Sequence, residues 1–246
     1  MNSTDGDDVA FIGVKSRNRQ PELMDQPELD PQLHQRALMG LRRVNHISGT
    51  AKHLWRPIWR LAAEFPDRPL RILDLASGGG DVAIDLARQA ARARVSVHVQ
   101  GCDISPVAVQ YAQEQARTAN LKNVEFVVHD VLQQPLGATF DVVTCSLFLH
   151  HLDDGDAIRV LQCMAAATRH LVLVDDLRRT WFGYAMAWIG SRLLTRSPIV
   201  HVDGPLSVAG AYAVEEVARL AGQAGLNGCS IDCHWPQRFL LNWRKP

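Results

Sequence analysis

The chain has 246 residues, 47% of them hydrophobic, and its 26 basic residues are balanced by 26 acidic ones. A chain of this length can bury the core of one large α/β domain, and the even charge balance argues against nucleic-acid binding. The five cysteines form no C-x-x-C pair and no metal-ligand spacing with histidine, so we expect reduced thiols, a cytoplasmic location and no bound metal. No signal peptide and no apolar run long enough to cross a bilayer is recognisable, so no stable membrane insertion is expected.

The first sixty-six residues lack the alternation of strands and helices that follows. Residues 1–30 are polar and charged and carry several prolines in an acidic setting, which predicts a flexible arm. Residues 31–66 show apolar positions at helical spacing. Asp30 followed by Pro31 is a typical helix start, so a helical cap of two or more pieces is predicted over this range.

From residue 67 to the C-terminus the pattern is that of one α/β domain. Short apolar runs of strand type alternate with amphipathic helical patterns, which predicts right-handed βαβ units and a parallel, doubly wound sheet. The predicted strands cover 71–76, 95–103, 124–130, 140–147 and 171–175, and the predicted helices cover 81–93, 106–119 and 154–168.

The alternation stops after the fifth predicted strand. Residues 177–210 are mostly apolar and aromatic with two prolines, and we interpret them as a helical insertion that caps the substrate. A helix over 212–224 and two strands over 229–235 and 238–243 follow. Only two residues separate these strands, so they must be antiparallel. The predicted fold is a seven-stranded, mostly parallel, Rossmann-like sheet with a closing antiparallel hairpin.

The first strand turns into the first helix through three glycines, Gly78 to Gly80. Such a turn places backbone N–H groups and the positive end of a helix together, which suits a negatively charged group. The acidic Asp74 at the strand end indicates that the ligand also carries a positive group or a donor. The third glycine of the dinucleotide fingerprint is missing, which disfavours a nucleotide-dependent oxidoreductase.

Further acidic residues stand at the ends of the next strands. The Asp103 carboxylate can accept both hydroxyls of a ribose, and Asp130 can accept from an exocyclic amine such as that of adenine. The ends of parallel strands meet at one edge, where ligands of doubly wound folds lie. Each aspartate alone is explained as well by a turn or capping role, but successive strand ends that fit one ligand are harder to dismiss.

Four motifs together resemble the class I S-adenosylmethionine-dependent methyltransferases, in the branch of the ubiquinone and menaquinone methyltransferases. They are Asp74-Leu75-Ala76-Ser77-Gly78-Gly79-Gly80-Asp81, Asp103-Ile104-Ser105, His129-Asp130-Val131, and Phe140 to Val143 with Leu149-His150-His151-Leu152. The resemblance spans about residues 70–245, with Ala76 in place of the family's first glycine. It implies S-adenosylmethionine as cofactor, bound by Asp74, Ala76, Ser77, Gly78, Gly80, Asp103, Ile104, Asp130, Val131 and Cys145.

The resemblance also implies methyl transfer to a small-molecule acceptor, at an oxygen or carbon of a phenolic, quinone-like or polyketide-derived compound. His151, His150 and His201 are the candidates for a catalytic base, each with packing or capping as its alternative. The N-terminal Arg42, Asn45 and His46 are candidates for covering the methionyl end of the cofactor. An aromatic segment could line the acceptor pocket, or pack on the core or on a second subunit of a homodimer; it holds Trp181, Phe182, Tyr184, Trp188 and Ile189.

Three other functions remain open at this point. One is an oxidoreductase that uses a nucleotide on a Rossmann sheet. Another is a nucleic-acid or protein methyltransferase. The neutral net charge of the chain argues against a nucleic-acid substrate. The last is a subunit that keeps the fold and binds without catalysis, which the alanine at position 76 allows.

Overall fold

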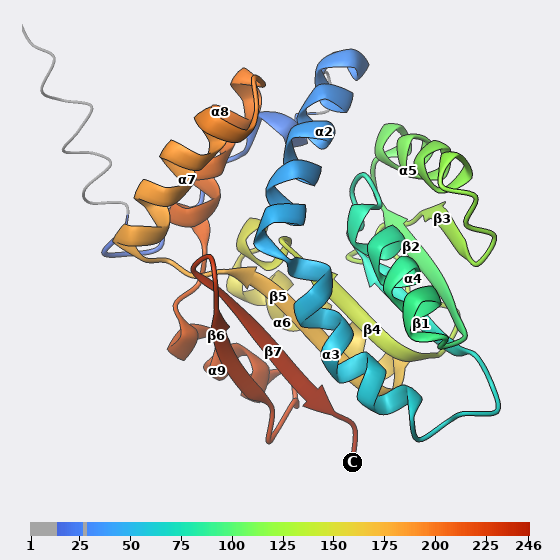
Figure 1. Cartoon of the computed structure of the whole chain (residues 1–246). Helices are drawn as coiled ribbons and strands as arrows, with labels where there is room; N and C mark the ends of the chain where they lie inside the picture. The colour runs from blue at the N-terminus through green and yellow to red at the C-terminus, as the bar shows by residue number, and fades with distance from the viewer. Residues whose placement is uncertain (1–13, 27–28) are drawn as a thin grey trace, which may run out of the picture.

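The computed structural model describes residues 14–26 and 29–246, and its centre is a seven-stranded sheet (Figure 1). The strand order is β3-β2-β1-β4-β5-β7-β6. The first five strands are parallel, and β7 pairs antiparallel with both β5 and β6. The predicted sheet and its closing hairpin are therefore confirmed. The strands are β1 Leu70–Leu75, β2 Val97–Asp103, β3 Val124–Val128, β4 Phe140–Ser146, β5 Thr168–Leu177, β6 Ser230–His234 and β7 Arg238–Arg244.

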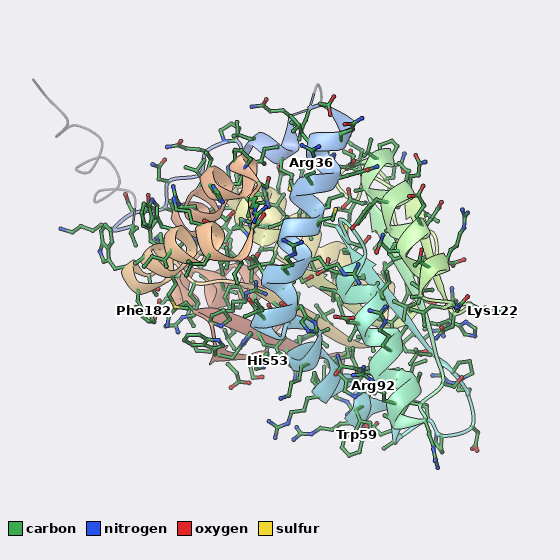
Figure 2. All side chains as sticks on the ribbon, turned by 45° about the horizontal axis from the view of Figure 1, so that its top comes forward. Arg36, His53, Trp59, Arg92, Lys122 and Phe182 are labelled. Carbon is green, nitrogen blue, oxygen red and sulfur yellow. The ribbon has the colours of Figure 1, made fainter. Side chains whose placement is uncertain are left out.

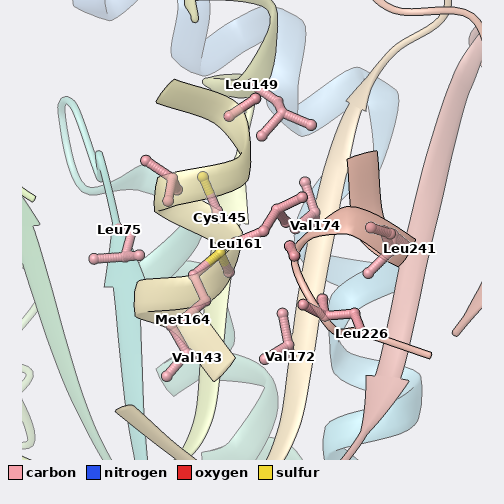
Figure 3. Packing of buried hydrophobic residues seen from close by; sticks show 14 of the residues in the cluster. Leu75, Val143, Cys145, Leu149, Leu161, Met164, Val172, Val174, Leu226 and Leu241 are labelled. Carbon is pink, nitrogen blue, oxygen red and sulfur yellow. The ribbon is translucent and has the colours of Figure 1, made fainter. Parts of the chain in front are cut away.

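Helices cover both faces of the sheet. The helices α3, α4 and α5 share one apolar cluster with β1 and β2, and α6 and α9 share another with β4 and β5. The central strand β4 is buried along nearly its whole length, and Val142 packs into the first cluster. Val143 and Cys145 pack into the second, which Figure 3 shows. Two-sided burial explains why such strands appear in the sequence as continuous apolar runs. The helices are α3 Thr50–Ala62, α4 Asp81–Ala93, α5 Pro106–Thr118, α6 Asp154–Ala167 and α9 Val214–Gln223.

Three more helices lie beyond the carboxyl ends of the parallel strands (Figure 1). The helix α2 spans Pro31–Ser48, and α7 (Trp181–Leu194) and α8 (Pro198–Gly210) form the predicted helical insertion. The helix α2 is separated from α3 by Gly49, which has a φ of +68°. Within the described part of the chain, no helix combines the length and the apolar character needed to cross a bilayer.

The described part of the predicted flexible arm over 1–30 makes contacts with the domain. Residues 1–13 and 27–28 lie outside the described residues. The Arg17 guanidinium lies 3.6 Å from the centre of the Tyr212 ring and donates to the backbone oxygens of Gly210 and Leu152. The backbone N–H groups at the start of a short 3₁₀ helix, η1 (Leu23–Asp25), donate to the buried Asp203 carboxylate. These contacts are long-range and have no signal in local sequence pattern.

Candidate cofactor and active site

The turn between β1 and α4 is tight because three of its residues take the left-handed conformation. Ala76, Gly78 and Gly80 have φ angles of +50°, +50° and +74°. A Cβ atom on Gly80 would lie 2.5 Å from a Phe126 ring atom and 2.7 Å from the Ala112 Cβ. Position 80 therefore admits only glycine, whereas Ala76 holds a Cβ in a conformation that disfavours one.

Asp74 lies beneath this turn and is completely buried. One carboxylate oxygen accepts a 2.8 Å hydrogen bond from the Thr144 hydroxyl, while the other is buried and has no hydrogen-bond partner within the described chain. Burial raises the pKa of Asp74 to about 7, against the hydrogen bond from Thr144, and the nearby Asp81 and Asp103 raise it further. A buried carboxylate oxygen without a partner fits a ligand that brings a donor or a positive charge.

Asp103 ties the end of β2 to the turn. One of its carboxylate oxygens accepts from the Gly78 N–H at 2.8 Å and the other from the Ser105 N–H at 2.9 Å. A carboxylate has about four lone-pair sites, so these bonds still leave it able to accept the hydroxyls of a diol. The residue that follows, Ile104, leaves 65% of its surface exposed, a large apolar side chain beside a polar turn.

Asp130 holds the turn after β3. Its Oδ1 accepts from the backbone N–H groups of Leu132 and Gln133, which leaves Oδ2 as the oxygen that could meet an adenine amine. Val131 is buried in the core beside it, and the His129 N–H donates to the Asp103 backbone oxygen at 2.9 Å. The structure thus joins the turns after β2 and β3, as the sequence predicts.

Two predicted cofactor residues are buried beneath the surface of this edge. The Cys145 side chain is completely enclosed in the core, and burial raises the pKa of its thiol. Only the backbone of Cys145 can therefore meet a ligand. The Ser77 hydroxyl is buried and has no hydrogen-bond partner in the described part of the chain, so it is a second polar atom beside the turn that a ligand could satisfy.

The helix α2 crosses the turn and is bonded to the domain below it. Leu38 packs against Tyr111 of α5, the Asn45 amide donates to Asp81 at the start of α4 at 3.0 Å, and Arg42 donates to Gln115 of α5 at 2.6 Å. His46 lies 3.9 Å from the Asp85 carboxylate. The structure thus brings all three predicted α2 residues to the side of the turn.

The same contacts reach a residue that the sequence reasoning missed, Arg238 of β7. It is almost fully buried, donates to Asn45 at 3.2 Å and to Asp175 at 3.4 Å, and also bonds the Thr50 hydroxyl. An arginine at the first position of a mostly apolar strand was the available signal. Its partners are supplied by α2, α3 and β5, which only the fold brings together.

His150 is enclosed between two carboxylates. It follows β4, in the 3₁₀ helix η2 (Leu149–His151), and its Nδ1 lies 2.7 Å from the Asp176 carboxylate. Its Nε2 lies 3.7 Å from Glu22 of the N-terminal arm. Burial lowers the pKa of His150, but Asp176 and Glu22 outweigh it and raise the value to about 10. His150 is therefore protonated on both ring nitrogens near neutral pH and cannot act as a base.

The other two candidate histidines are placed differently. The His151 ring lies against that of His150, with the centroids 4.2 Å apart, and its Nε2 is 4.0 Å from Glu22. His201, on α8, has its Nε2 2.8 Å from the Thr195 backbone oxygen, so it connects α8 to the end of α7. The structure thus brings His150 and His151 together, whereas the His201 ring contacts the Thr195 backbone.

Glu22, His150 and His151 hold their potential ligand atoms within 4.8 Å of one another, so they could surround a cation. The carboxylates of Glu22 and Asp176 already have a positive partner in protonated His150, and the surroundings lower the pKa of both. Burial opposes this shift in each case, and the histidine overcomes it. Two carboxylates and one protonated histidine leave this group with one net negative charge.

Comparison with known proteins agrees with this site. Residues 72–170, which hold the strand-end motifs, match the model of a methyltransferase domain. The demethylmenaquinone methyltransferase of Deinococcus radiodurans is 34% identical over 100 residues, which cover 39% of each chain. The ubiquinone biosynthesis O-methyltransferase of Cupriavidus pinatubonensis is 26% identical over 204 residues, 76% of this chain and 77% of that one. The first of these matches therefore spans well under half of the relative, and the second about three quarters.

Solved methyltransferase structures share the fold. The magnesium protoporphyrin IX methyltransferase of Synechocystis, determined with bound S-adenosylhomocysteine, aligns with a TM-score of 0.57 at 17% identity over 98% of this chain and 95% of that one. A S-adenosylmethionine-dependent methyltransferase from Aquifex aeolicus aligns with a TM-score of 0.57 at 18% identity over 88% and 99%. The comparisons together confirm the resemblance to class I S-adenosylmethionine-dependent methyltransferases and support S-adenosylmethionine as the cofactor.

Two substitutions in the turn should change stability in opposite directions. Ala76→Gly removes a Cβ from a left-handed residue and should stabilise the protein by about 1 kcal/mol. Gly80→Ala adds a Cβ that meets Phe126, and it should destabilise by roughly 2 kcal/mol or more. Urea denaturation of the two variants beside the parent measures both changes. A loss of stability in Ala76→Gly would contradict the left-handed assignment of that residue.

The raised pKa of Asp74 predicts pH-dependent cofactor binding. In the free protein Asp74 is protonated below about pH 7, whereas a ligand ammonium group favours the carboxylate form. Affinity for S-adenosylhomocysteine should therefore fall as the pH is lowered, by about tenfold between pH 7.5 and pH 5.5. Titration calorimetry at both pH values measures this, and Asp74→Asn is the control, because its affinity should no longer depend on the proton. An equally steep pH dependence in that variant would assign the effect to another group, such as Asp81.

Proposed function

We propose that this protein transfers a methyl group from S-adenosylmethionine to a small-molecule acceptor, at an oxygen or carbon of a phenolic, quinone-like or polyketide-derived compound. One observation carries the proposal. Asp74, the glycine turn, Asp103 and Asp130 stand at successive strand ends along one edge of the sheet, within the range that matches a methyltransferase domain. An oxidoreductase on the same kind of sheet lacks this support.

The residues of the edge fit the parts of the cofactor. Asp74, with its unpaired buried oxygen, suits the methionyl ammonium group, and the Asp103 carboxylate suits the ribose hydroxyls. The exposed Ile104 offers an apolar surface for the adenine ring, and Asp130 an acceptor for its amine. We expect Ala76, Ser77, Gly78 and Gly80 to meet the cofactor through the turn, and Arg42, Asn45 and His46 to cover its methionyl end.

Catalysis of such a transfer depends mainly on alignment. A sulfonium is a good leaving group, so holding donor and acceptor in line can supply much of the rate enhancement. An acceptor hydroxyl must also lose its proton. His150 is already protonated between Asp176 and Glu22 and cannot act as the base. We therefore assign removal of the acceptor proton to the neighbouring His151. We assign to His150 the positioning of the His151 ring.

The acceptor class follows from the surroundings of the site and from the relatives. The N-terminal arm and α8 meet around His150, since Glu22 contacts it and the Ser207 hydroxyl of α8 donates to Glu22 at 2.5 Å. Such an enclosure suits a small molecule better than nucleic acid. The relatives named for quinone methylation point to a phenolic or quinone-like acceptor. A cytoplasmic location and a homodimer stay predictions.

A thermal-shift assay tests the proposed cofactor. Ligands that bind only the native state raise the melting temperature. At a ligand concentration of one hundred times Kd, the added free energy of unfolding is about 2.7 kcal/mol. S-adenosylhomocysteine should therefore raise the melting temperature clearly, and NADPH should leave it unchanged. A shift with NADPH alone would favour the oxidoreductase, and no shift with S-adenosylhomocysteine would remove the basis of the proposal. Binding without turnover of any acceptor would favour the non-catalytic subunit.

His151→Ala tests the assignment of the base. With a hydroxyl acceptor, kcat should fall by about 10² to 10⁴, the usual contribution of a positioned base, while affinity for S-adenosylhomocysteine stays the same. His201→Ala is the comparison, because that histidine contacts the Thr195 backbone. A fall of similar size in His201→Ala and none in His151→Ala would transfer the role to the insertion.

A further inference from the structure

The helix α7 turns its large apolar residues toward solvent. Its exposed residues recur at i, i+1, i+4, i+7, i+8, i+11 and i+12, which is one continuous helical face. Phe182 is 59% exposed and Leu193, three turns later, is 79% exposed. Figure 2 shows Phe182 on the outer side of the molecule. We call these residues the α7 face: Trp181, Phe182, Ala185, Trp188, Ile189, Arg192 and Leu193.

The residues of α7 that are buried are small. Only Gly183 and Ser191 are fully buried within the helix. The neighbouring α8 lies against this side, since a Cβ on Gly204 would be 3.5 Å from the Ser191 Cβ, an ordinary contact distance. Trp181, Phe182, Trp188 and Ile189 are exposed, so of the three alternatives for this aromatic segment, packing on the core is excluded for these four residues. A contiguous apolar face of this kind marks an interaction surface.

The charges around the α7 face have one sign. Residues 177–202 contain four arginines and neither aspartate nor glutamate. One of the four, Arg179, is paired with Glu216 of α9, which leaves Arg178, Arg192 and Arg196. The Arg192 guanidinium lies 4.1 Å from the centre of the Trp188 ring, so the charge sits within the face. Residues 31–62, which form α2 and α3, contain six lysines and arginines and again no acidic residue. The net charge of the whole chain is zero, but its charges are unevenly distributed. Residues 31–62 and 177–202 form a cationic cap, and the rest of the chain is acidic.

A cationic groove adjoins the C-terminal end of α7. Its volume is about 1050 Å³, and Leu194 of α7 lines it together with Arg42, Arg43 and Lys52. Arg88 and Arg92 of α4 add positive charge, and the one carboxylate in the lining, Asp85, is bonded to Arg88 at 3.1 Å. The groove can take anionic head groups next to the place where α7 exposes Leu193.

We propose that the α7 face docks on an anionic lipid surface, with the helix lying in the plane of the head groups. Tryptophan and phenylalanine beside arginine are the composition of interfacial helices, in which the apolar side enters the acyl boundary and the cations meet phosphate. With 14 residues, α7 is too short to span the bilayer. Two other occupants fit the α7 face less well. A second copy of the chain would bring its own arginines against the arginines of this face, and a nucleic acid would leave the apolar centre of the face exposed to water.

Co-sedimentation with vesicles tests the proposal, on the whole protein and without cofactor, so its outcome is separate from that of methyl transfer. The protein should bind vesicles of equal parts POPC and POPG at least tenfold more tightly than vesicles of POPC alone. The double variant Phe182→Glu/Leu193→Glu should lose at least tenfold in affinity for the anionic vesicles. The double variant Arg192→Gln/Arg196→Gln should lose most of the preference for POPG. Val128→Glu is the matched control, since Val128 is 54% exposed on the edge strand β3, away from α7, and it should bind as the parent does.

Several results would overturn the proposal. They are failure of the parent protein to bind POPG vesicles, equal binding by Phe182→Glu/Leu193→Glu, and equal loss in Val128→Glu. A lipid-free dimer that only Phe182→Glu/Leu193→Glu dissociates would show that a second copy covers the face. Tighter binding to a DNA duplex than to POPG vesicles, lost in Arg192→Gln/Arg196→Gln, would assign the cations to nucleic acid. Melting temperatures within a few degrees of the parent show that the variants are folded.

Discussion

The backbone at Gly80 has no room for a side chain, because Phe126 and Ala112 close over it. This restriction fixes where β1 ends and where α4 begins. It also holds the turn close enough to β2 for the Gly78 N–H to reach the Asp103 carboxylate. Asp74 is buried beneath the turn as a consequence, and its second oxygen is left without a partner. The packing of one glycine thus shapes both the turn and the buried acceptor below it.

The core could be predicted from the sequence because its signals are local. Strand-type runs alternate with helical patterns, and the aspartates follow strands in chain order, so a parallel sheet places them along one edge. Glu22 and Arg238 could not be found in this way. Glu22 meets His150 from the N-terminal arm, and Arg238 meets Asn45 from the last strand. Both contacts join residues more than a hundred positions apart, and only the assembled fold brings them together.

The α7 segment shows a different limit of sequence patterns. The sequence predicts a helical insertion there, but the prediction of a helix does not say which of its faces is covered. The assumption that the aromatic side is buried fails because the buried residues of α7 are the small Gly183 and Ser191. The result is a division within one chain. The acidic core holds the cofactor edge, and the cationic cap, formed by α2, α3 and the insertion, presents an apolar helix to its surroundings.

The central claim is that the edge formed by Asp74, the glycine turn and Asp103 binds an adenosine-bearing cofactor through its ribose. Titration calorimetry of S-adenosylhomocysteine with the parent and with Asp103→Asn tests it most directly, with circular dichroism to show that the variant keeps its fold. We predict one site per chain in the parent and an affinity at least tenfold weaker in Asp103→Asn, which loses the charged acceptor for the diol. An unchanged dissociation constant in the folded variant would contradict this account.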